Sequence, residues 1–320
     1  MTQNDNGYIV SFEERKSSVL TPSSLACLSK TTTVNLSRGC AHQCLYCYTR
    51  GYSSWPGENK IVVYSNTFEK IQKEFARRRK TPECVYFSPS SDLFQPIPEI
   101  LELGYQILQF LFQNHVNVAV LTKGKIPQEF YPLFEQYKKQ VQFQMGLVTL
   151  NNEILSIFEP NAPCAEARLD QIKQLTSLGI PVRARLDPIL PGLTDDKDSL
   201  NNLCEQLKTA GVRELAASVL FMRPSILSSL KKNIQNEGIK QCLIDRFRFQ
   251  ENLEIHAGQS RVFALNSDER FEILERVRSI AAEHEIVCRL CSCKNPDMNS
   301  SSCRIAGEWK QNQNPLFDLD

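Results

Sequence analysis

The chain has almost no net charge and no long hydrophobic run, and both absences limit what it can be. Its 37 basic and 36 acidic residues leave a formal charge of +1 over 320 residues, so no overall field draws it to nucleic acid or to an anionic membrane. A local basic patch could still bind nucleic acid. No apolar run approaches the ~18 residues of a membrane-spanning helix, and the amino terminus does not resemble a secretion signal. We therefore expect a soluble, cytoplasmic protein with no membrane partner.

Short repeats and low-complexity tracts are also absent, and the chain instead alternates between two kinds of segment. Apolar, β-prone runs occur at residues 31–36, 83–88, 116–122, 141–149, 181–187 and 213–220. Amphipathic segments of helical periodicity occur at residues 67–80, 99–114, 129–139, 165–179, 198–211 and 267–284. Gly179 and Gly211 end two of these segments, where a helix C-cap favours a residue with positive φ.

This alternation predicts an α/β fold, a partial (βα)6 TIM-like barrel. Buried strands separated by helices form parallel sheets with right-handed crossovers, and six units are fewer than the eight of a closed barrel. In such folds the functional residues lie in loops at the carboxyl ends of the strands. We expect an N-terminal segment (1–30), the barrel (31–240) and a cysteine-rich C-terminal extension (241–320).

Cysteine is plentiful, with 12 residues, and it is unevenly distributed. In a cytosolic chain of this length, clustered cysteines bind metals or clusters more often than they form disulfides. Five cysteines stand alone in the sequence and are expected to be small, buried, apolar residues. They are Cys27, Cys84, Cys164, Cys204 and Cys242. The other seven form two clusters.

The first cluster lies in GCAHQCLYCYTRG (39–51), directly after the first predicted strand. Cys40, Cys44 and Cys47 have the spacing Cys-x3-Cys-x2-Cys, with no fourth cysteine nearby. Three thiolates suit a [4Fe–4S] cluster that keeps one iron open, and Gly39 lets the backbone turn tightly around the sulfur atoms. A zinc site completed by His42 or a distant cysteine is the alternative.

This motif, with an aromatic residue before its last cysteine, resembles the radical S-adenosylmethionine (radical SAM) superfamily. Other segments between residues 31 and 225 are similar to its spore photoproduct lyase-like branch. They are NLSRGCAHQCLYCYTR, SPSSDLFQP, LTKG, LVTLNNEILSIFEPNAPCAEARLDQIKQL and IPVRARLDPILPGLTD.

The resemblance implies an enzyme whose [4Fe–4S] cluster is reduced by a protein such as a flavodoxin or ferredoxin. The cluster would cleave S-adenosylmethionine (SAM) to methionine and a 5′-deoxyadenosyl radical, which abstracts hydrogen from the substrate. The sequence does not identify that substrate. A nucleotide or a nucleic-acid moiety is the candidate that the resemblance suggests.

The resemblance also implies roles for residues near the strand ends. Tyr46 would stack on the adenine, and Tyr48 would pass a hydrogen atom as a catalytic residue. Ser91 and Asp92 would meet the methionine amino group of SAM, and Lys123 would hold its carboxylate. The structural alternatives are a core tyrosine for Tyr46, a helix cap for Ser91 and Asp92, and a solvated side chain for Lys123.

Three further cofactor-binding candidates follow from the same resemblance. Thr149 ends the fourth predicted strand and would bond the ribose or carboxylate of SAM. Arg168, in a helical segment, is a second candidate for the carboxylate. On the fifth strand we expect one of Arg183 and Arg185 to point into the barrel, and we favour Arg185.

One position departs from the family pattern. In photoproduct lyases a hydrogen-donor cysteine lies two residues before the Ser of the Ser-Asp pair, and this chain has Pro89 there. Proline has no labile hydrogen to donate. We therefore expect no efficient thymine-dimer repair by that relay, whereas radical chemistry is still expected.

The second cluster lies in CRLCSCKNPDMNSSSC (288–303) and offers Cys288, Cys291, Cys293 and Cys303. Four thiols within sixteen residues can bind zinc or a second [4Fe–4S] cluster, and their tight spacing predicts a loop. We expect a cluster rather than zinc, because the chain already implies cluster-loading machinery. Such a cluster could relay electrons, anchor substrate or donate sulfur.

Two alternative functions remain open at the level of the sequence. One is a radical SAM enzyme that inserts sulfur supplied by the C-terminal cluster. The other is a non-catalytic, zinc-stabilised nucleic-acid-binding module that uses the basic run EFARRRK (74–80). A solvated helix face explains that run equally well.

Overall fold

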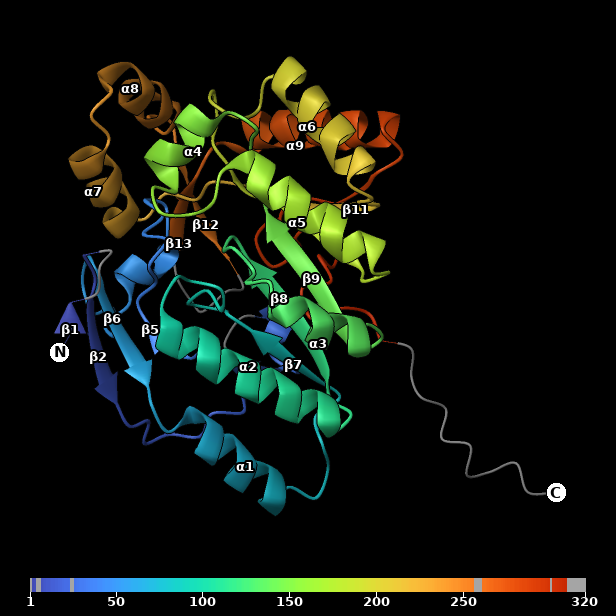
Figure 1. The fold of residues 1–320 in the computed structure, drawn as a ribbon. Coiled ribbons are helices and arrows are strands. Elements are labelled where there is room, and N and C mark those ends of the chain that lie inside the picture. Colours follow the sequence, from blue (N-terminus) through green and yellow to red (C-terminus); the bar gives the residue numbers. More distant parts are fainter. Residues whose placement is uncertain (1, 4–6, 24–25, 256–260, 300, 310–320) are drawn as a thin grey trace.

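The largest element of the fold is an eight-stranded sheet with helices packed on its outer face (Figure 1). The structure is a computed structural model, and it describes residues 2–3, 7–23, 26–255, 261–299 and 301–309. In spatial order the strands are β14 (Val287–Leu290), β11 (Glu214–Val219), β10 (Val182–Ile189), β9 (Val141–Gly146), β8 (Asn117–Thr122), β7 (Cys84–Phe87), β4 (Thr32–Val34) and β3 (Thr21–Pro22).

The six predicted strand runs are the strands β4, β7, β8, β9, β10 and β11 of this sheet. Neighbouring strands pair in parallel from β4 to β14, and β3 alone pairs antiparallel, with β4, among the described pairs of this sheet. The predicted α/β partial barrel is confirmed. One further parallel strand, β14, comes from the C-terminal extension and pairs with β11.

Helices connect successive strands, as expected for parallel pairing. The described α-helices are α1 (Thr67–Arg77), α2 (Pro98–Gln113), α3 (Phe130–Gln136), α4 (Asn152–Phe158), α5 (Ala165–Ser177), α6 (Lys197–Thr209), α7 (Pro224–Asn233), α8 (Glu237–Arg246) and α9 (Ser267–Glu283). Gly179 and Gly211 follow α5 and α6 with φ of +80° and +92°, as predicted. None of the described helices is long and apolar enough to cross a membrane.

A second, four-stranded sheet lies beside the barrel and holds the N-terminal segment against it (Figure 1). Its order is β1 (Thr2–Gln3), β2 (Ile9–Glu13), β6 (Lys60–Tyr64) and β5 (Ser37–Arg38). Since β5 precedes the first cysteine cluster and β6 follows it, this sheet fixes both ends of the loop that carries the cluster. A separate hairpin joins β12 (Glu251–Glu254) and β13 (Arg261–Ala264).

The two faces of the main sheet are packed differently, because alternate side chains of a strand point to opposite faces. One face packs on the helices and forms the main core. The interior face carries a smaller cluster that includes Tyr86, Ala119 and Ala216, and residues Cys303 and Ile305 pack against them. The segment after β14 therefore covers the interior of the barrel.

Candidate metal centre and cofactor site

The loop with the first three cysteines begins at a glycine that no other residue can replace without strain. Gly39 has φ of +78°, and a Cβ atom built on it would lie 2.3 Å from the carbonyl oxygen of Lys60 in β6. A side chain would have to displace backbone there. The close approach of the loop to β6 thus depends on Gly39.

Arg50 holds the outer side of this loop. It lies in the short 3-10 helix Tyr48–Gly51 and donates hydrogen bonds to the carbonyl oxygens of Cys44 (3.1 Å) and Gln43 (3.0 Å). Its guanidinium also contacts Glu58 at 3.3 Å and lies 5.4 Å from the ring centroid of Trp55. Arg50 therefore fixes the backbone between two of the cysteines.

Gln95 holds the inner side of the loop and is fully buried. Its side-chain oxygen accepts a hydrogen bond from the backbone N–H of Ala41 (3.0 Å), and its amide donates to Ser37 (3.1 Å) and to the carbonyl of Asp92 (2.8 Å). The hydroxyl of Tyr8 donates to the carbonyl of Ala41 (2.8 Å). The contacts of Ala41 with Gln95 and Tyr8 could not be predicted from the sequence, because they join segments far apart in the chain.

The cysteine thiols are chemically suited to binding a metal cluster. Cys40, Cys44 and Cys47 are free and only partly exposed. Burial raises the pKa of Cys40 to about 12 and raises the pKa of Cys44 well above its usual value. Because metals bind thiolates, a cluster at this site must displace the protons of these two thiols.

His42, the candidate zinc ligand, faces a carboxylate instead. Its Nδ1 lies 3.5 Å from Oδ2 of Asp92, and burial lowers the pKa of the imidazole. Within the described ranges, no three His, Cys, Asp or Glu side chains are arranged to bind a single metal ion. Three thiols that each bind a different iron of a cluster need no such common point. Three thiols are the donor set of a [4Fe–4S] cluster with one open iron, whereas a structural zinc site needs a fourth ligand.

Asp92 joins the end of β7 to the end of β8. Its carboxylate accepts hydrogen bonds from the N–H of Phe94 (2.9 Å), the hydroxyl of Thr122 (2.7 Å) and the N–H of Lys123 (2.8 Å). Ser91 is buried beside it. Asp92 therefore accepts backbone hydrogen bonds, much as the alternative role of a helix cap would require. Its contact with the SAM amino group stays a prediction.

Lys123 and Tyr46 lie together, although they come from different loops. The Lys123 ammonium lies 5.7 Å from the centroid of the Tyr46 ring. A Cβ atom on Gly146, at the end of β9, would come within 2.9 Å of that ammonium, so the glycine leaves the space that the lysine occupies. The hydroxyl of Tyr46 donates to the carboxylate of Glu159. The structure thus brings two predicted cofactor residues to one place next to the cluster loop.

Arg168 has other partners than the predicted cofactor carboxylate. Its guanidinium lies 2.5 Å from the carboxylate of Glu159, both side chains are completely buried, and it donates to the carbonyls of Gly146 (2.9 Å) and Pro163 (2.9 Å). Burial raises the pKa of Glu159, but Arg168 and Lys123 outweigh it and lower that pKa. Arg168 therefore keeps Glu159 charged beneath Tyr46. Contact of Arg168 with the carboxylate of SAM stays a prediction.

The hydroxyl of Tyr48 lies next to Pro89, the residue that departs from the family pattern. This hydroxyl donates to the carbonyl of Pro89, and the Tyr48 ring packs edge-on against Tyr52 with centroids 5.7 Å apart. Burial raises the pKa of Tyr48 well above its usual value, so the phenol keeps its proton at neutral pH. A hydrogen-transfer role for Tyr48 stays a prediction.

Arg185 lies on the interior face of β10, as favoured from the sequence, but Arg183 lies on the same face, so the expectation that only one of the two points inward was wrong. Residues two apart on a strand share a face. Arg185 donates to Gln144 (3.0 Å) and pairs with Asp187 (2.8 Å), while Arg183 pairs with Glu214 (2.8 Å). Contact of Arg185 with SAM stays a prediction.

Thr149 is buried in the loop between β9 and α4. Its hydroxyl oxygen accepts a hydrogen bond from the N–H of Asn151 (3.1 Å), the residue that caps α4. The hydroxyl proton is left for another partner. A bond from Thr149 to SAM stays a prediction.

The C-terminal cysteines are grouped differently from the sequence motif. The thiols of Cys291, Cys293 and Cys303 lie together with that of Cys27, which contacts both Cys293 and Cys303. Cys288 lies on β14 with its side chain against the main core, and it is not among these neighbours. Alternation along β14 explains the difference. Cys27, predicted to be an isolated core residue, takes the place expected for Cys288.

The other cysteines predicted to be isolated fall into two groups. Cys84 and Cys204 are buried, as expected. Cys164 is exposed just before α5, and Cys242 is partly exposed on α8. Burial of a lone cysteine therefore could not be predicted from its type alone.

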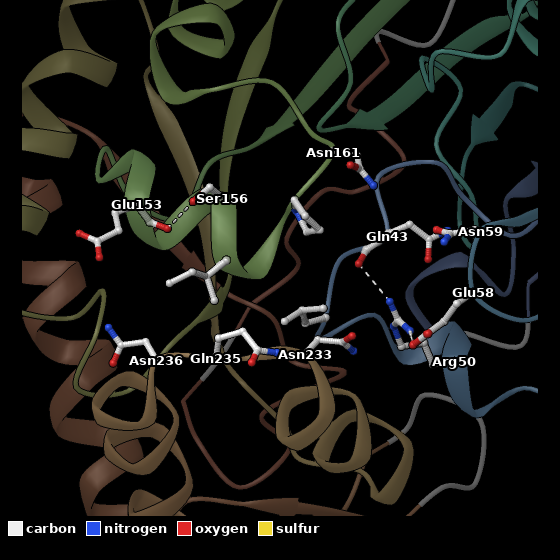
Figure 2. Close-up of a pocket in the computed structure, with 13 residues that line it drawn as sticks. Gln43, Arg50, Glu58, Asn59, Glu153, Ser156, Asn161, Asn233, Gln235 and Asn236 are labelled. Atoms are coloured by element: carbon white, nitrogen blue, oxygen red, sulfur yellow. Dashed lines mark hydrogen bonds and ion pairs between the residues drawn. The ribbon is translucent and has the colours of Figure 1, made fainter. Parts of the chain in front are cut away.

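A pocket of about 580 Å³ lies on the outer side of the cluster loop, and Figure 2 shows it. None of the residues predicted from the sequence to form the site line it. The lining residues are Gln43, Leu45, Arg50, Glu58, Asn59, Glu153, Ser156, Ile157, Pro160, Asn161, Asn233, Gln235 and Asn236. Most are uncharged and polar, so the walls of this pocket offer hydrogen-bond donors and acceptors.

A family model described as the radical SAM superfamily matches residues 34–227, which is more than half of the chain. The chain belongs to the radical SAM superfamily. Because this superfamily consists of enzymes, the non-catalytic zinc-stabilised module is not supported. The basic run Arg77–Arg79 begins at the end of α1, so it precedes β7 and lies at the opposite end of that strand from Asp92.

The chain is also similar in sequence to several curated proteins. An uncharacterised protein of Mycobacterium tuberculosis is 28% identical over 202 residues, covering 60% of this chain and 59% of that protein. The chain therefore spans about three fifths of that relative. An uncharacterised protein of Acidianus two-tailed virus is 23% identical over 257 residues (75% of this chain, 80% of the relative). A protein of a Pseudomonas phage named radical SAM Nα-GlyT isomerase is 24% identical over 173 residues (54% and 35%).

Solved structures of spore photoproduct lyase have the same radical SAM fold. A variant with bound SAM and dinucleoside spore photoproduct superposes with a TM-score of 0.65 at 15% identity, covering 88% of this chain and 81% of the lyase. A second variant gives a TM-score of 0.63 at 14% identity with the same coverage. The fold that the resemblance implied is confirmed.

Proposed function

We propose that this chain is a radical SAM enzyme that holds a [4Fe–4S] cluster through Cys40, Cys44 and Cys47 and binds SAM beside it. The observation that carries the proposal is a loop with three free thiols that Gly39, Arg50 and buried side chains hold in place. When bound, the cluster supplies the electron that cleaves SAM reductively to methionine and a 5′-deoxyadenosyl radical.

The residues around the loop support a binding mode for SAM. Lys123 places a positive charge for the methionine carboxylate, and Tyr46 offers a ring for the adenine. Ser91 and Asp92 supply oxygen atoms for the amino group. Glu159 holds the Tyr46 hydroxyl, so it orients the ring instead of binding the cofactor itself.

For the substrate, we propose a nucleotide or a nucleic-acid moiety. The support is the fold shared with spore photoproduct lyase, whose structure was solved with a dinucleoside spore photoproduct. A reducing protein such as a flavodoxin or ferredoxin would supply the electron in the cytoplasm. The pocket in Figure 2 exposes Gln43 and Arg50 of the cluster loop, and we propose that the reductant approaches there.

Formation of 5′-deoxyadenosine tests the proposal. The anaerobically purified protein, reconstituted with iron and sulfide, is mixed with SAM and dithionite, and 5′-deoxyadenosine is measured by chromatography. The wild type should form it, and the variant with Cys40→Ala, Cys44→Ala and Cys47→Ala should not. Cys164→Ala, a substitution at an exposed cysteine, is the matched control and should behave as the wild type. Product formation by the triple variant would contradict the proposal.

Sulfur insertion is the second candidate function. It is favoured by the group of Cys27, Cys291, Cys293 and Cys303, because that group packs on the interior face of the barrel. A product that gains sulfur, found by mass spectrometry, would distinguish it from hydrogen abstraction alone.

A further inference from the structure

Four thiols from the two ends of the chain meet on the interior face of the barrel. Cys27 lies in the short 3-10 helix Ala26–Leu28, and the other three follow β14. The Cys27 side chain contacts those of both Cys293 and Cys303, and the Cys291 side chain contacts the same two. The four thiols therefore form a closed ring of contacts, and all of them are free cysteines.

The position of this ring follows from the order of the main sheet. β3 and β14 are its two edge strands, and no pairing between them is found among the described strands. Cys27 follows β3, and Cys291 directly follows β14. The segment after β14 also covers the interior face, where Ile305 packs in one cluster with Tyr86. A link within the ring would therefore join the two edges of the open barrel and hold this cover in place.

The backbone around the thiols is held independently of any bound group. The N–H of Ser301 donates a hydrogen bond to the carbonyl of Leu290 (2.8 Å), which brings the segment of Cys303 beside the end of β14. Asn295 is fully buried, and its N–H and its side-chain amide both donate to the carbonyl of Cys291 (2.9 and 3.1 Å). The turn that carries the thiols is therefore well defined before any metal binds.

The contacts between the sulfur atoms limit which metal group can fit. Zn–S bonds of about 2.3 Å in a tetrahedron place four sulfur atoms about 3.8 Å apart, which is the separation of thiols in contact. A [4Fe–4S] cluster binds each thiolate at a different iron, so the cluster itself holds the four sulfur atoms apart. The ring of contacts therefore fits one tetrahedral ion, and a cubane would have to spread it open.

Disulfides fit this arrangement less well. A disulfide joins one pair of sulfur atoms, whereas Cys27 and Cys291 each have two sulfur neighbours. Arg185 also donates a hydrogen bond to Cys303 from the barrel side. Four thiolates around a divalent ion carry a net negative charge, which this guanidinium partly offsets. The sulfur atoms of a disulfide carry no such charge.

We propose that Cys27, Cys291, Cys293 and Cys303 bind one zinc ion, which fastens the N-terminal segment to the segment after β14. Four thiolates complete the coordination of zinc, so the site is structural and leaves no position for a substrate. Cys288 takes no part, although it forms a Cys-x2-Cys pair with Cys291, because its side chain packs against the main core. Zinc carries no sulfide, so this assignment and the sulfur-insertion candidate exclude each other.

Zinc binding changes the contacts within the ring. Among the described residues, no three side chains of His, Cys, Asp or Glu already surround one ion position. The four thiols instead hydrogen-bond to one another, so zinc replaces the protons of these bonds and draws the sulfur atoms toward a common centre. Metal binding at this site therefore tightens the link between the two edges of the sheet.

Metal analysis of the full chain tests the proposal. The triple variant with Cys40→Ala, Cys44→Ala and Cys47→Ala is used throughout, so that iron at the first loop does not enter the count. Purified anaerobically from medium that supplies both iron and zinc, it should contain about one zinc per chain and no sulfide. Adding Cys27→Ser should lower the zinc content severalfold. Adding Cys288→Ser instead, the matched control, should leave it unchanged.

Cobalt gives a second readout of the same site. Co²⁺ added to the triple variant after treatment with a chelator should produce the visible absorption of tetrahedral cobalt–thiolate coordination. Cys27→Ser should weaken these bands severalfold, and Cys288→Ser should keep them. Circular dichroism checks that each variant is folded, and Cys293→Ser replaces Cys27→Ser if the latter is not.

Four results would overturn the proposal. One is about four irons with sulfide in the triple variant, and another is a single iron in place of zinc. A third is zinc that survives Cys27→Ser and Cys293→Ser but is lost with Cys288→Ser. The last is a protein without metal, whether its cysteines are free thiols or disulfides. Because the first three cysteines are replaced in every variant compared, none of these outcomes depends on the proposed reaction with SAM.

Discussion

Lys123 places a half-buried positive charge next to the loop that carries the first three cysteines. Its backbone N–H is held by Asp92, and its side chain crosses Gly146 toward the ring of Tyr46. The side chain is thus directed by two strand ends at once. A carboxylate that enters this space would meet an oriented cation in a partly desolvated site.

Lys123→Ala should therefore weaken SAM binding. A charge-assisted hydrogen bond of this kind contributes about 1.5–3 kcal/mol, which corresponds to a rise in Kd of about tenfold or more. Equilibrium binding of SAM to the reconstituted protein, measured by calorimetry, checks this. Lys125→Ala, two residues away and exposed, is the control and should bind as the wild type does. An unchanged Kd for Lys123→Ala would show that the lysine does not bind the carboxylate of SAM.

Gly39→Ala should impair cluster binding. The new Cβ would lie 2.3 Å from the Lys60 carbonyl oxygen, and φ is +78°, so the loop must shift before it can hold three irons. We expect the iron content of the first site to fall severalfold. Gly179→Ala is a matched control, because it has φ of +80° with no atom within 4 Å of the added Cβ. It should lower stability slightly and keep the iron.

The candidate site was predictable to different extents from one residue to the next. Cys40, Cys44 and Cys47 could be recognised as a candidate cluster site from their spacing, because three closely spaced thiolates can bind three irons of a [4Fe–4S] cluster. Glu159 and Gln95 could not be found in this way. A buried carboxylate or amide is recognisable only from its partners, and those partners lie on other segments.

At the scale of the elements, one carboxylate joins three parts of the fold. Glu214, on β11, accepts hydrogen bonds from Arg183 on β10 (2.8 Å), Arg289 on β14 (3.0 Å) and Arg304 in the segment after β14 (2.7 Å). Burial raises its pKa, but the bonds from Arg289 and Arg183 outweigh burial and lower the pKa to about 2. Glu214 therefore stabilises the folded state in its charged form.

This lowered pKa gives a stability that depends on pH. It is fully present above the ordinary glutamate pKa of 4.5 and is lost as pH falls from there toward 2. Glu214→Gln should thus lower the free energy of unfolding by about 2–3 kcal/mol at pH 7, and by about half of that or less at pH 3.

Urea unfolding of the cluster-free protein, followed by circular dichroism, measures this difference. Glu205→Gln, at an exposed position on α6, is the control and should change the unfolding free energy little at either pH. A destabilisation by Glu214→Gln that is equal at pH 7 and pH 3 would contradict the assignment.

Strands were easier to predict than the helices near the site. The six parallel strands lie in apolar, β-prone runs that the sequence shows directly, although Arg183 and Arg185 interrupt the run of β10. β14 was missed because it has only four residues and because the tight cysteine spacing from Cys288 onward was taken to indicate a loop. α4 and α7 were also missed. α4 has only seven residues, and its N-cap Asn151 is easily taken for part of a loop.

At the scale of the whole molecule, the two ends of the chain complete the barrel. The segment after β14 covers the interior face through bonds such as that from Gln144 to the carbonyl of Cys303 (2.9 Å). Cys27 lies next to the same segment. The sequence motif suggested four cysteines within one loop, and it could not show that a residue from the N-terminal segment replaces one of them.

The chain should not repair spore photoproduct efficiently. Pro89 stands where the resemblance places a hydrogen-donor cysteine, and the nearby Tyr48 hydroxyl is bonded to the Pro89 carbonyl. Dinucleoside spore photoproduct incubated with the active protein should give no detectable thymine product under conditions that yield 5′-deoxyadenosine. Pro89→Cys restores a thiol at that position and tests whether its absence is the cause. Efficient repair by the wild type would point to another donor.

The central claim is that Cys40, Cys44 and Cys47 leave one iron open for SAM, and electron paramagnetic resonance tests it most directly. The spectrum of the dithionite-reduced wild type is recorded with and without SAM, beside that of the variant in which the three cysteines are alanine. The account predicts a cluster signal that SAM changes in the wild type, and no SAM-dependent change in the variant. A wild-type signal that SAM leaves unaltered, or a SAM response that survives in the variant, would contradict it.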